Sequence, residues 1–235
     1  MVWSCLVSIL PGMAQTEKLT DYVNPFVGTD GYGNVYPGAQ IPFGGIQISP
    51  DTDSRFYDAA SGYKYNHLTL MGFSLTHLSG TGIPDLGDFL FIPGTGEMKL
   101  EPGTHEDPDQ GYRSRYSHDK EWASPNYYAV ELADYGVKAE MTSGVRSGMF
   151  RFTYPESDNA FIMIDMNHTL WQSCEWSNLR MINDSTITGY KLVKGWGPER
   201  HVYFTATFSK KLTGLRFVQD KKPVIYNTSR FRSSY

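Results

Sequence analysis

A series of short segments with the composition of β-strands constrains the fold more than any other feature of the sequence. The segments are rich in β-branched and aromatic residues, and Gly, Pro, Asn, Asp or Ser separates each from the next, as expected for strands joined by turns. Polar and apolar residues alternate clearly in Arg151-Phe152-Thr153-Tyr154, whereas no segment has the period of an amphipathic helix. A spacing of about ten residues predicts an all-β fold, an antiparallel β-sandwich. The predicted strands are Tyr127–Leu132, Val137–Met141, Met149–Tyr154, Phe161–Met166, Thr186–Val193 and Val202–Phe208.

The part of the chain between Tyr22 and Pro50 is dense in Gly and Pro, which excludes helices there. Its glycines do not match G-x-G-x-x-G and no G-K-[ST] follows, so a phosphate-binding loop is excluded. Asp51-Thr52-Asp53 opens like a calcium loop, but Phe56 and Gly62 stand where an EF-hand requires glycine and a bidentate glutamate. An EF-hand is therefore excluded as well.

Composition limits the partners of the chain. Its 235 residues are 40% hydrophobic and carry a net charge of −4, with no run of Lys and Arg longer than two residues. Nucleic acid is therefore excluded as a partner. Aromatic residues make up 14% of the chain, including 16 Tyr, which suits neutral polar ligands such as sugars but equally suits the core of a β-sheet. No linker or internal repeat divides the sequence, so one β domain is predicted.

The N-terminal segment resembles the second half of a secretory signal. Residues 1–14 are mainly apolar and end in Gly12-Met13-Ala14, a plausible cleavage site, although the basic start of a signal peptide is missing. We therefore expect a partial signal peptide over residues 1–14 and export to the periplasm, the cell surface or the medium; a buried first strand is the alternative. The segment is too short to span a membrane, and no transmembrane segment is expected. Cleavage would remove Cys5 and leave Cys174 as the single cysteine.

The most polar loop of the sequence runs from Thr76 to Asp88. It contains an imidazole, hydroxyls, two carboxylates, three glycines and a proline between two apolar segments. Such a composition indicates a loop that a rigid scaffold presents to a ligand. The alternative is a tight connector whose Asp and Ser side chains bond their own backbone.

The two carboxylates of this loop, Asp85 and Asp88, have the residue types of a glycosidase pair, but their spacing along a loop does not fix the distance between them. Cation binding or recognition of sugar hydroxyls is equally compatible. His77 could donate a hydrogen bond to a ligand or could be structural. Trp196, between two glycines, could stack on a pyranose ring or lie in the core. No Ser-His-Asp order, H-E-x-x-H or C-x-x-C occurs, so hydrolase triads and zinc sites lack support.

Several motifs, in order, resemble the N-terminal domain of glycoside hydrolase family 92, the calcium-dependent exo-α-mannosidases. The resemblance is strongest over residues 22–97 and continues more loosely through Lys194-Gly195-Trp196. The motifs are Tyr22-Val23-Asn24-Pro25-Phe26-Val27-Gly28-Thr29-Asp30, Pro37-Gly38-Ala39-Gln40-Ile41-Pro42-Phe43-Gly44, Ser61-Gly62-Tyr63-Lys64-Tyr65, Gly72-Phe73-Ser74-Leu75-Thr76-His77-Leu78-Ser79-Gly80-Thr81-Gly82 and Asp85-Leu86-Gly87-Asp88.

The resemblance implies a β-sandwich packed on a C-terminal (α/α)6 helical barrel, with the substrate pocket between them. It implies an inverting reaction in which a glutamic acid protonates the leaving oxygen, an aspartate activates water and Ca²⁺ contacts mannose hydroxyls. In the family these groups come mainly from the helical domain. We therefore expect residues 17–235 to be a C-terminally incomplete sandwich domain without catalytic residues. We also expect it to be inactive alone and poorly soluble or marginally folded without its partner domain.

The resemblance also implies a set of substrate-binding residues. Tyr57 stands where family members often carry a Trp that walls the terminal-mannose subsite, and Asp58 is either a pocket group or a turn residue. Trp196 is included as a stacking candidate. The residues that match the family's central loop are His77, Ser79, Gly80, Thr81, Asp85 and Asp88.

The expected function is the substrate-pocket domain of an inverting exo-α-mannosidase that acts on terminal α-mannosides, of the α-1,2 type, in glycans. Its expected partners are a mannose-containing glycan and the protein's own C-terminal domain. A stand-alone carbohydrate-binding module is the first alternative. A self-contained glycosidase using Asp85 and Asp88 is the second, and a purely structural domain the third.

Overall fold

The computed structural model describes residues 17–54, 57–219, 221–224 and 230–231. Within these residues the chain forms strands and short 3-10 helices but no α-helix. The signal peptide predicted over residues 1–14 lies outside the described part. No helix in the described part is long and apolar enough to cross a membrane.

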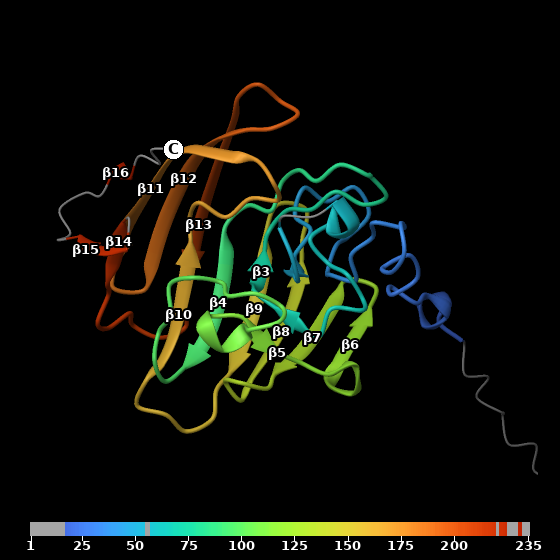
Figure 1. Ribbon diagram of the computed structural model, residues 1–235, viewed down its shortest axis with the longest axis horizontal. Helices are drawn as coiled ribbons and strands as arrows, with labels where there is room; N and C mark the ends of the chain where they lie inside the picture. The colour runs from blue at the N-terminus through green and yellow to red at the C-terminus, as the bar shows by residue number, and fades with distance from the viewer. Residues whose placement is uncertain (1–16, 55–56, 220, 225–229, 232–235) are drawn as a thin grey trace, which may run out of the picture.

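The longer strands lie in the middle of the chain, and those near the C-terminus are short again (Figure 1). The 3-10 helices are η1 (Leu19–Tyr22), η2 (Tyr57–Ala59), η3 (Pro108–Gln110) and η4 (His118–Lys120). The strands are β1 (Ser49–Asp51), β2 (Thr69–Leu70), β3 (Gly72–Ser74), β4 (Leu90–Thr95), β5 (Ser114–Arg115), β6 (Glu121–Ser124), β7 (Tyr127–Leu132), β8 (Val137–Ser143), β9 (Gly148–Thr153), β10 (Ala160–Asp165), β11 (Ser173–Asn183), β12 (Thr186–Lys194), β13 (Arg200–Thr207), β14 (Phe217–Gln219), β15 (Lys222–Val224) and β16 (Arg230–Phe231).

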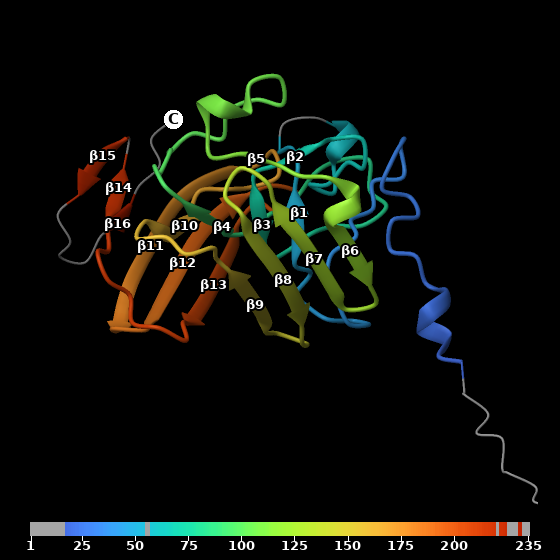
Figure 2. The same cartoon turned by 90° about the horizontal axis from the view of Figure 1, so that it is seen from below.

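The larger sheets have four strands each, in the orders β1-β3-β4-β10, β6-β7-β8-β9 and β13-β12-β11-β16, and every pairing is antiparallel. Smaller two-stranded sheets join β2 to β5 and β14 to β15. Figure 2 shows β6–β9 and β11–β13 in one curved layer, with β1, β3, β4 and β10 in the layer above. The predicted antiparallel β-sandwich is confirmed.

Aromatic side chains fill the space between the two layers. The ring of Phe91 on β4 lies 5.1 Å from that of Phe150 on β9 and 6.1 Å from that of Phe204 on β13. Phe91 therefore contacts both sheets of the opposite layer. Because burial of such rings is the main favourable term in folding, this contact holds the two halves of the curved layer against one core.

The predicted strands agree with β7, β8, β9, β10, β12 and β13 to within two residues at each end. The longest strand, β11, was missed. Its sequence, SCEWSNLRMIN, does not alternate cleanly because the pairing with β12 shifts between Cys174 and Trp176 and again between Met181 and Asn183. Each such irregularity adds a residue to one strand and changes the face on which the following side chains lie.

The polar loop connects β3 to β4, and its two limbs are paired. The backbone N–H of Leu75 donates to the oxygen of Asp88 at 2.9 Å, and that of Gly87 donates to Thr76 at 2.8 Å. His77 and Leu86 form an antiparallel bridge. The two limbs of the loop therefore extend the β3–β4 pairing as far as His77 and Leu86, and the tip of the loop lies beyond the sheet.

Candidate functional site

The six loop residues predicted to border the sugar separate into an outer and an inner group. Ser79 and Gly80 at the tip are exposed, and Thr81 is half-buried. The tip is held by a hydrogen bond from Gly80 N to the oxygen of Asn34, 2.7 Å long. The inner group is His77, Asp85 and Asp88, whose side chains are buried in the stem of the loop.

His77 is bonded on both sides of its ring and is only 2% exposed. Its Nδ1 lies 2.7 Å from the backbone oxygen of Gln47, and its Nε2 lies 2.7 Å from Oδ1 of Asp51. Nε2 also lies 3.0 Å from Oγ of Ser74, so every polar atom of the ring has a partner within the chain. His77 is therefore paired with Asp51, and a direct contact of its ring nitrogens with a sugar, which the sequence suggested, stays an untested prediction.

Asp51 joins two histidines that are far apart in the sequence. Its Oδ2 accepts a hydrogen bond from Nε2 of His168 at 2.7 Å, while Oδ1 accepts from His77. Burial alone would raise the pKa of Asp51, but the charges and hydrogen bonds of the two histidines outweigh it and hold the pKa well below its usual range. The carboxylate needs Gly62 beside it, because a Cβ on that residue, at φ +86°, would lie 2.2 Å from Oδ1.

The sequence analysis missed Asp51 and His168 as parts of this network. Asp51 drew attention only as the start of a rejected calcium loop. His168 carries no local signal, because only the fold brings it to a residue 117 positions earlier in the chain.

Asp88 lies in a second buried ion cluster. Its Oδ1 is 3.0 Å from Nζ of the fully buried Lys191, and its Oδ2 accepts from Arg200 and from Oγ1 of Thr76. Burial alone would raise the pKa of Asp88. The charges of Lys191 and Arg200 lower it by more than burial raises it, so the net shift of the pKa is downward. Lys191 also donates to the backbone oxygen of His168, which connects this cluster to the first.

Asp85 holds the turn between β12 and β13. Its Oδ2 accepts from the backbone N–H of Trp196 at 3.0 Å, and its Oδ1 accepts from that of Leu86 at 2.6 Å. A Cβ on Gly195 would lie 3.0 Å from each of these oxygens, so glycine lets the turn approach the carboxylate. Asp85 therefore positions Trp196.

These contacts give no support to a self-contained glycosidase built on Asp85 and Asp88. Both side chains are buried, and both bond donors of the protein itself. A general acid must hold a proton near neutral pH, whereas the pKa of Asp88 is lowered. The geometry assigns both residues to shaping the loop and its surroundings.

The described residues do not offer a calcium site either. No group of three or more His, Cys, Asp or Glu side chains in the described part is placed to hold a metal ion. Ca²⁺ takes six to eight oxygen ligands, and Asp51, Asp85 and Asp88 are already bonded to nitrogen donors of the chain. Where an enzyme containing this chain would hold calcium stays untested.

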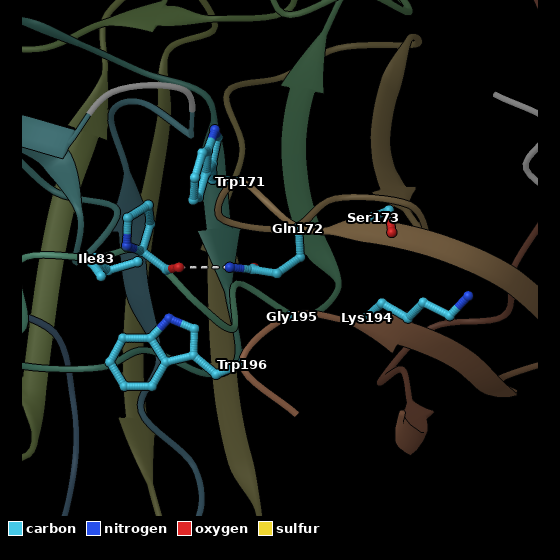
Figure 3. Close-up of a pocket in the computed structure, with 8 residues that line it drawn as sticks. Ile83, Trp171, Gln172, Ser173, Lys194, Gly195 and Trp196 are labelled. Atoms are coloured by element: carbon cyan, nitrogen blue, oxygen red, sulfur yellow. Dashed lines mark hydrogen bonds between the residues drawn. The ribbon is translucent and has the colours of Figure 1, made fainter. Parts of the chain in front are cut away.

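An open hollow of about 570 Å³ lies beside the polar loop (Figure 3). Trp171 and Trp196 lie on either side of Ile83, and they are 54% and 59% exposed. Nε2 of Gln172 donates to the oxygen of Pro84 at 2.6 Å, which fixes the amide between the two indoles. The lining residues are Ile83, Pro84, Trp171, Gln172, Ser173, Lys194, Gly195 and Trp196.

The aromatic wall of the hollow extends to Tyr57. Its ring centroid is 5.2 Å from that of Trp171, and the ring is half exposed. Trp171 has φ +71°, a conformation that bulky residues rarely adopt and that gathers at functional sites. The structure thus brings the predicted Tyr57 and Trp196 to one region, together with Trp171, which the sequence analysis missed. The side chain of Asp58 lies outside the described atoms, so its role stays open.

Comparison with known proteins identifies the family. Residues 22–234 match the family described as "Glycosyl hydrolase family 92 N-terminal domain". An uncharacterized secreted glycosidase of Arthroderma benhamiae is 30% identical over 139 residues, which cover 58% of this chain and 17% of that protein.

Two solved structures are similar in fold. The family 92 glycosyl hydrolase ccman5 has a TM-score of 0.75 and 27% identity over 91% of this chain. A family 92 inverting mannosidase of Bacteroides thetaiotaomicron has a TM-score of 0.73 and 23% identity over 92% of this chain. The match covers 29% of each of those chains, so this chain spans less than a third of their length. It belongs to glycosyl hydrolase family 92, as the N-terminal domain of that family.

Proposed function

We propose that this chain forms one wall of a pocket for terminal α-mannosides, of the α-1,2 type, in an exported inverting exo-α-mannosidase. The observation that carries the proposal is the hollow between Trp171 and Trp196, two exposed indoles beside the polar loop. Aromatic faces pack against the C–H faces of a sugar ring, while the surrounding polar groups meet its hydroxyls.

The same proposal assigns catalysis to another domain. The carboxylates beside the hollow are bonded within the chain, and family 92 relatives with solved structures are more than three times as long as the match. The acid, the base and the Ca²⁺ ligands are therefore proposed to come from a C-terminal helical domain. Calcium in such an enzyme would contact mannose hydroxyls. Without such a domain, this chain is expected to bind a mannoside but not to hydrolyse it.

Titration of the chain with methyl α-mannoside, followed by tryptophan fluorescence, tests the wall. Saturable binding is expected, with a weak dissociation constant on the order of 1 mM because one wall of the pocket is present. Trp196→Ala should abolish the signal. Trp122→Ala is the matched control, since Trp122 is also exposed but lies on β6 and does not line the hollow. Equal binding by wild type and Trp196→Ala would contradict the proposal.

Export is proposed from the leader-like segment and from the relative named as secreted. N-terminal sequencing of the exported protein is expected to begin after Ala14. Protein that stays inside the cell with residues 1–14 attached would contradict this part of the proposal.

A further inference from the structure

A group of aromatic side chains lies on the outer face of the sheet formed by β11, β12 and β13, away from the core. The inner face of this sheet packs through Leu179, Val202 and Phe204 against the layer that contains β4. Side chains alternate along each strand, so the neighbouring positions point outward, as the alternating burial along β13 shows. The outward aromatic group, here called the platform, consists of Trp176, Tyr190, His201 and Tyr203.

The rings of the platform form a continuous surface across the three strands. The centroid of the Tyr190 ring is 4.9 Å from that of Trp176, 4.6 Å from that of Tyr203 and 5.8 Å from that of His201. The Tyr190 hydroxyl is 2.7 Å from Nδ1 of His201, whose Nε2 is 2.7 Å from Oε1 of Glu199. These bonds fix the rings, and the side chain of Tyr203 is 70% exposed. The platform is thus preorganised and open.

The chemistry of the platform favours a neutral polyhydroxyl ligand. Contiguous exposed apolar surface marks interaction sites, and tyrosine combines an apolar face with a hydroxyl that bonds polar groups. The charged groups beside the platform include Lys194, which pairs with Glu175 at 3.3 Å, and Glu199, which lies 2.7 Å from His201. The exposed Arg180 lies on the same face of β11 as Trp176.

The platform is continuous with the hollow. Tyr190, Leu192 and Lys194 lie on the same face of β12, since they are two residues apart along the strand. Lys194 lines the hollow, and Tyr190 lies four residues away, about 13 Å along the strand. A chain of sugars that enters the hollow with one end can therefore follow this face.

We propose that the platform binds the further sugar units of the glycan whose terminal unit occupies the hollow. The proposal rests on the mannoside pocket proposed above. It adds a second contact region with its own residues, and it makes affinity depend on the length of the glycan.

Calorimetric titration of the chain with mannose and with α-1,2-linked mannotriose and mannotetraose tests the platform. The longer sugars should bind about fivefold more tightly than mannose, which corresponds to one good aromatic contact. Tyr203→Ala should lose this gain and keep the affinity for mannose, while Tyr203→Phe, which retains the ring, should keep both. In the wild-type chain, the NMR signals of the Tyr190 and Tyr203 rings should shift with mannotetraose and not with mannose.

The outcomes separate the two proposals. Mannose binding that does not strengthen with length, or ring signals that stay unchanged, would overturn the platform and leave the hollow intact. If a protein partner covers the platform instead of a glycan, affinity would likewise not depend on the length of the sugar. Absence of any mannose binding would overturn the pocket, and the platform with it.

Discussion

Replacing Asp51 with asparagine should destabilise the chain more than any surface substitution. The variant keeps the size of the side chain but removes the charge that lies 2.7 Å from each of two histidine rings. The buried His77 ring would lose its carboxylate partner, and the new amide could not accept from both histidines with two oxygens as the carboxylate does. Removing one partner of a buried ion pair costs about 3–5 kcal/mol. For a chain of this size that corresponds to a fall in melting temperature of about 6–20 °C.

Urea denaturation followed by tryptophan fluorescence measures this loss. Asp184→Asn is the matched control, because Asp184 pairs with Lys211 at 2.7 Å on the exposed surface, where such a pair contributes less than about 1 kcal/mol. Equal midpoints for Asp51→Asn and Asp184→Asn would refute the account of the His77–Asp51–His168 network.

The pH dependence of the wild-type chain follows from the same carboxylate. The pKa of Asp51 is lower in the folded than in the unfolded chain, so the unfolded chain binds more protons at acid pH. The stabilisation is complete above the unfolded pKa of about 3.9 and is lost as the pH falls below it. Asp51→Asn should lack this part of the acid slope, so urea midpoints of the two proteins should converge as the pH is lowered through 4 to 2. A constant difference would contradict the assignment.

Three other variants or conditions test separate parts of the structure. Gly62→Ala should push the carboxylate of Asp51 away from His77 and lower the free energy of unfolding by more than about 1 kcal/mol, the usual strain at positive φ; an unchanged urea midpoint would contradict the close contact. Lys191→Met should cost about 3 kcal/mol because it leaves Asp88 buried with fewer charges, while Lys194→Met, which breaks an exposed pair, should cost under about 1 kcal/mol; calorimetric unfolding compares them. EDTA should not change methyl α-mannoside binding by this chain, measured by fluorescence, and a loss of binding would place a calcium ligand within it.

Much of the fold could be predicted from the sequence because short strands on two packed layers leave a local pattern. Arg151-Phe152-Thr153-Tyr154 alternates because Phe152 faces the core and its neighbours do not. The same rule failed at β11, where shifts in pairing after Cys174 and Met181 break the alternation. The face on which each side chain of such a strand lies depends on its pairing with the neighbouring strand, which the sequence of the strand alone does not show.

The candidate site was predictable only in part. The polar loop was recognised by its composition, but composition does not reveal that Asp85 and Asp88 bond backbone and side-chain donors more than a hundred residues away. Trp171 lacks the flanking glycines that drew attention to Trp196. These contacts depend on long-range packing, so only the fold shows which polar groups remain for a ligand.

A crystal structure of the chain soaked with methyl α-mannoside is the most direct test of the central claim, that this domain supplies an aromatic wall for a mannoside and no catalytic groups. The account predicts an intact sugar ring in the hollow between Trp171 and Trp196, with Asp85 and Asp88 still bonded to the protein. An empty hollow at saturating ligand, or a cleaved sugar beside Asp88, would contradict it.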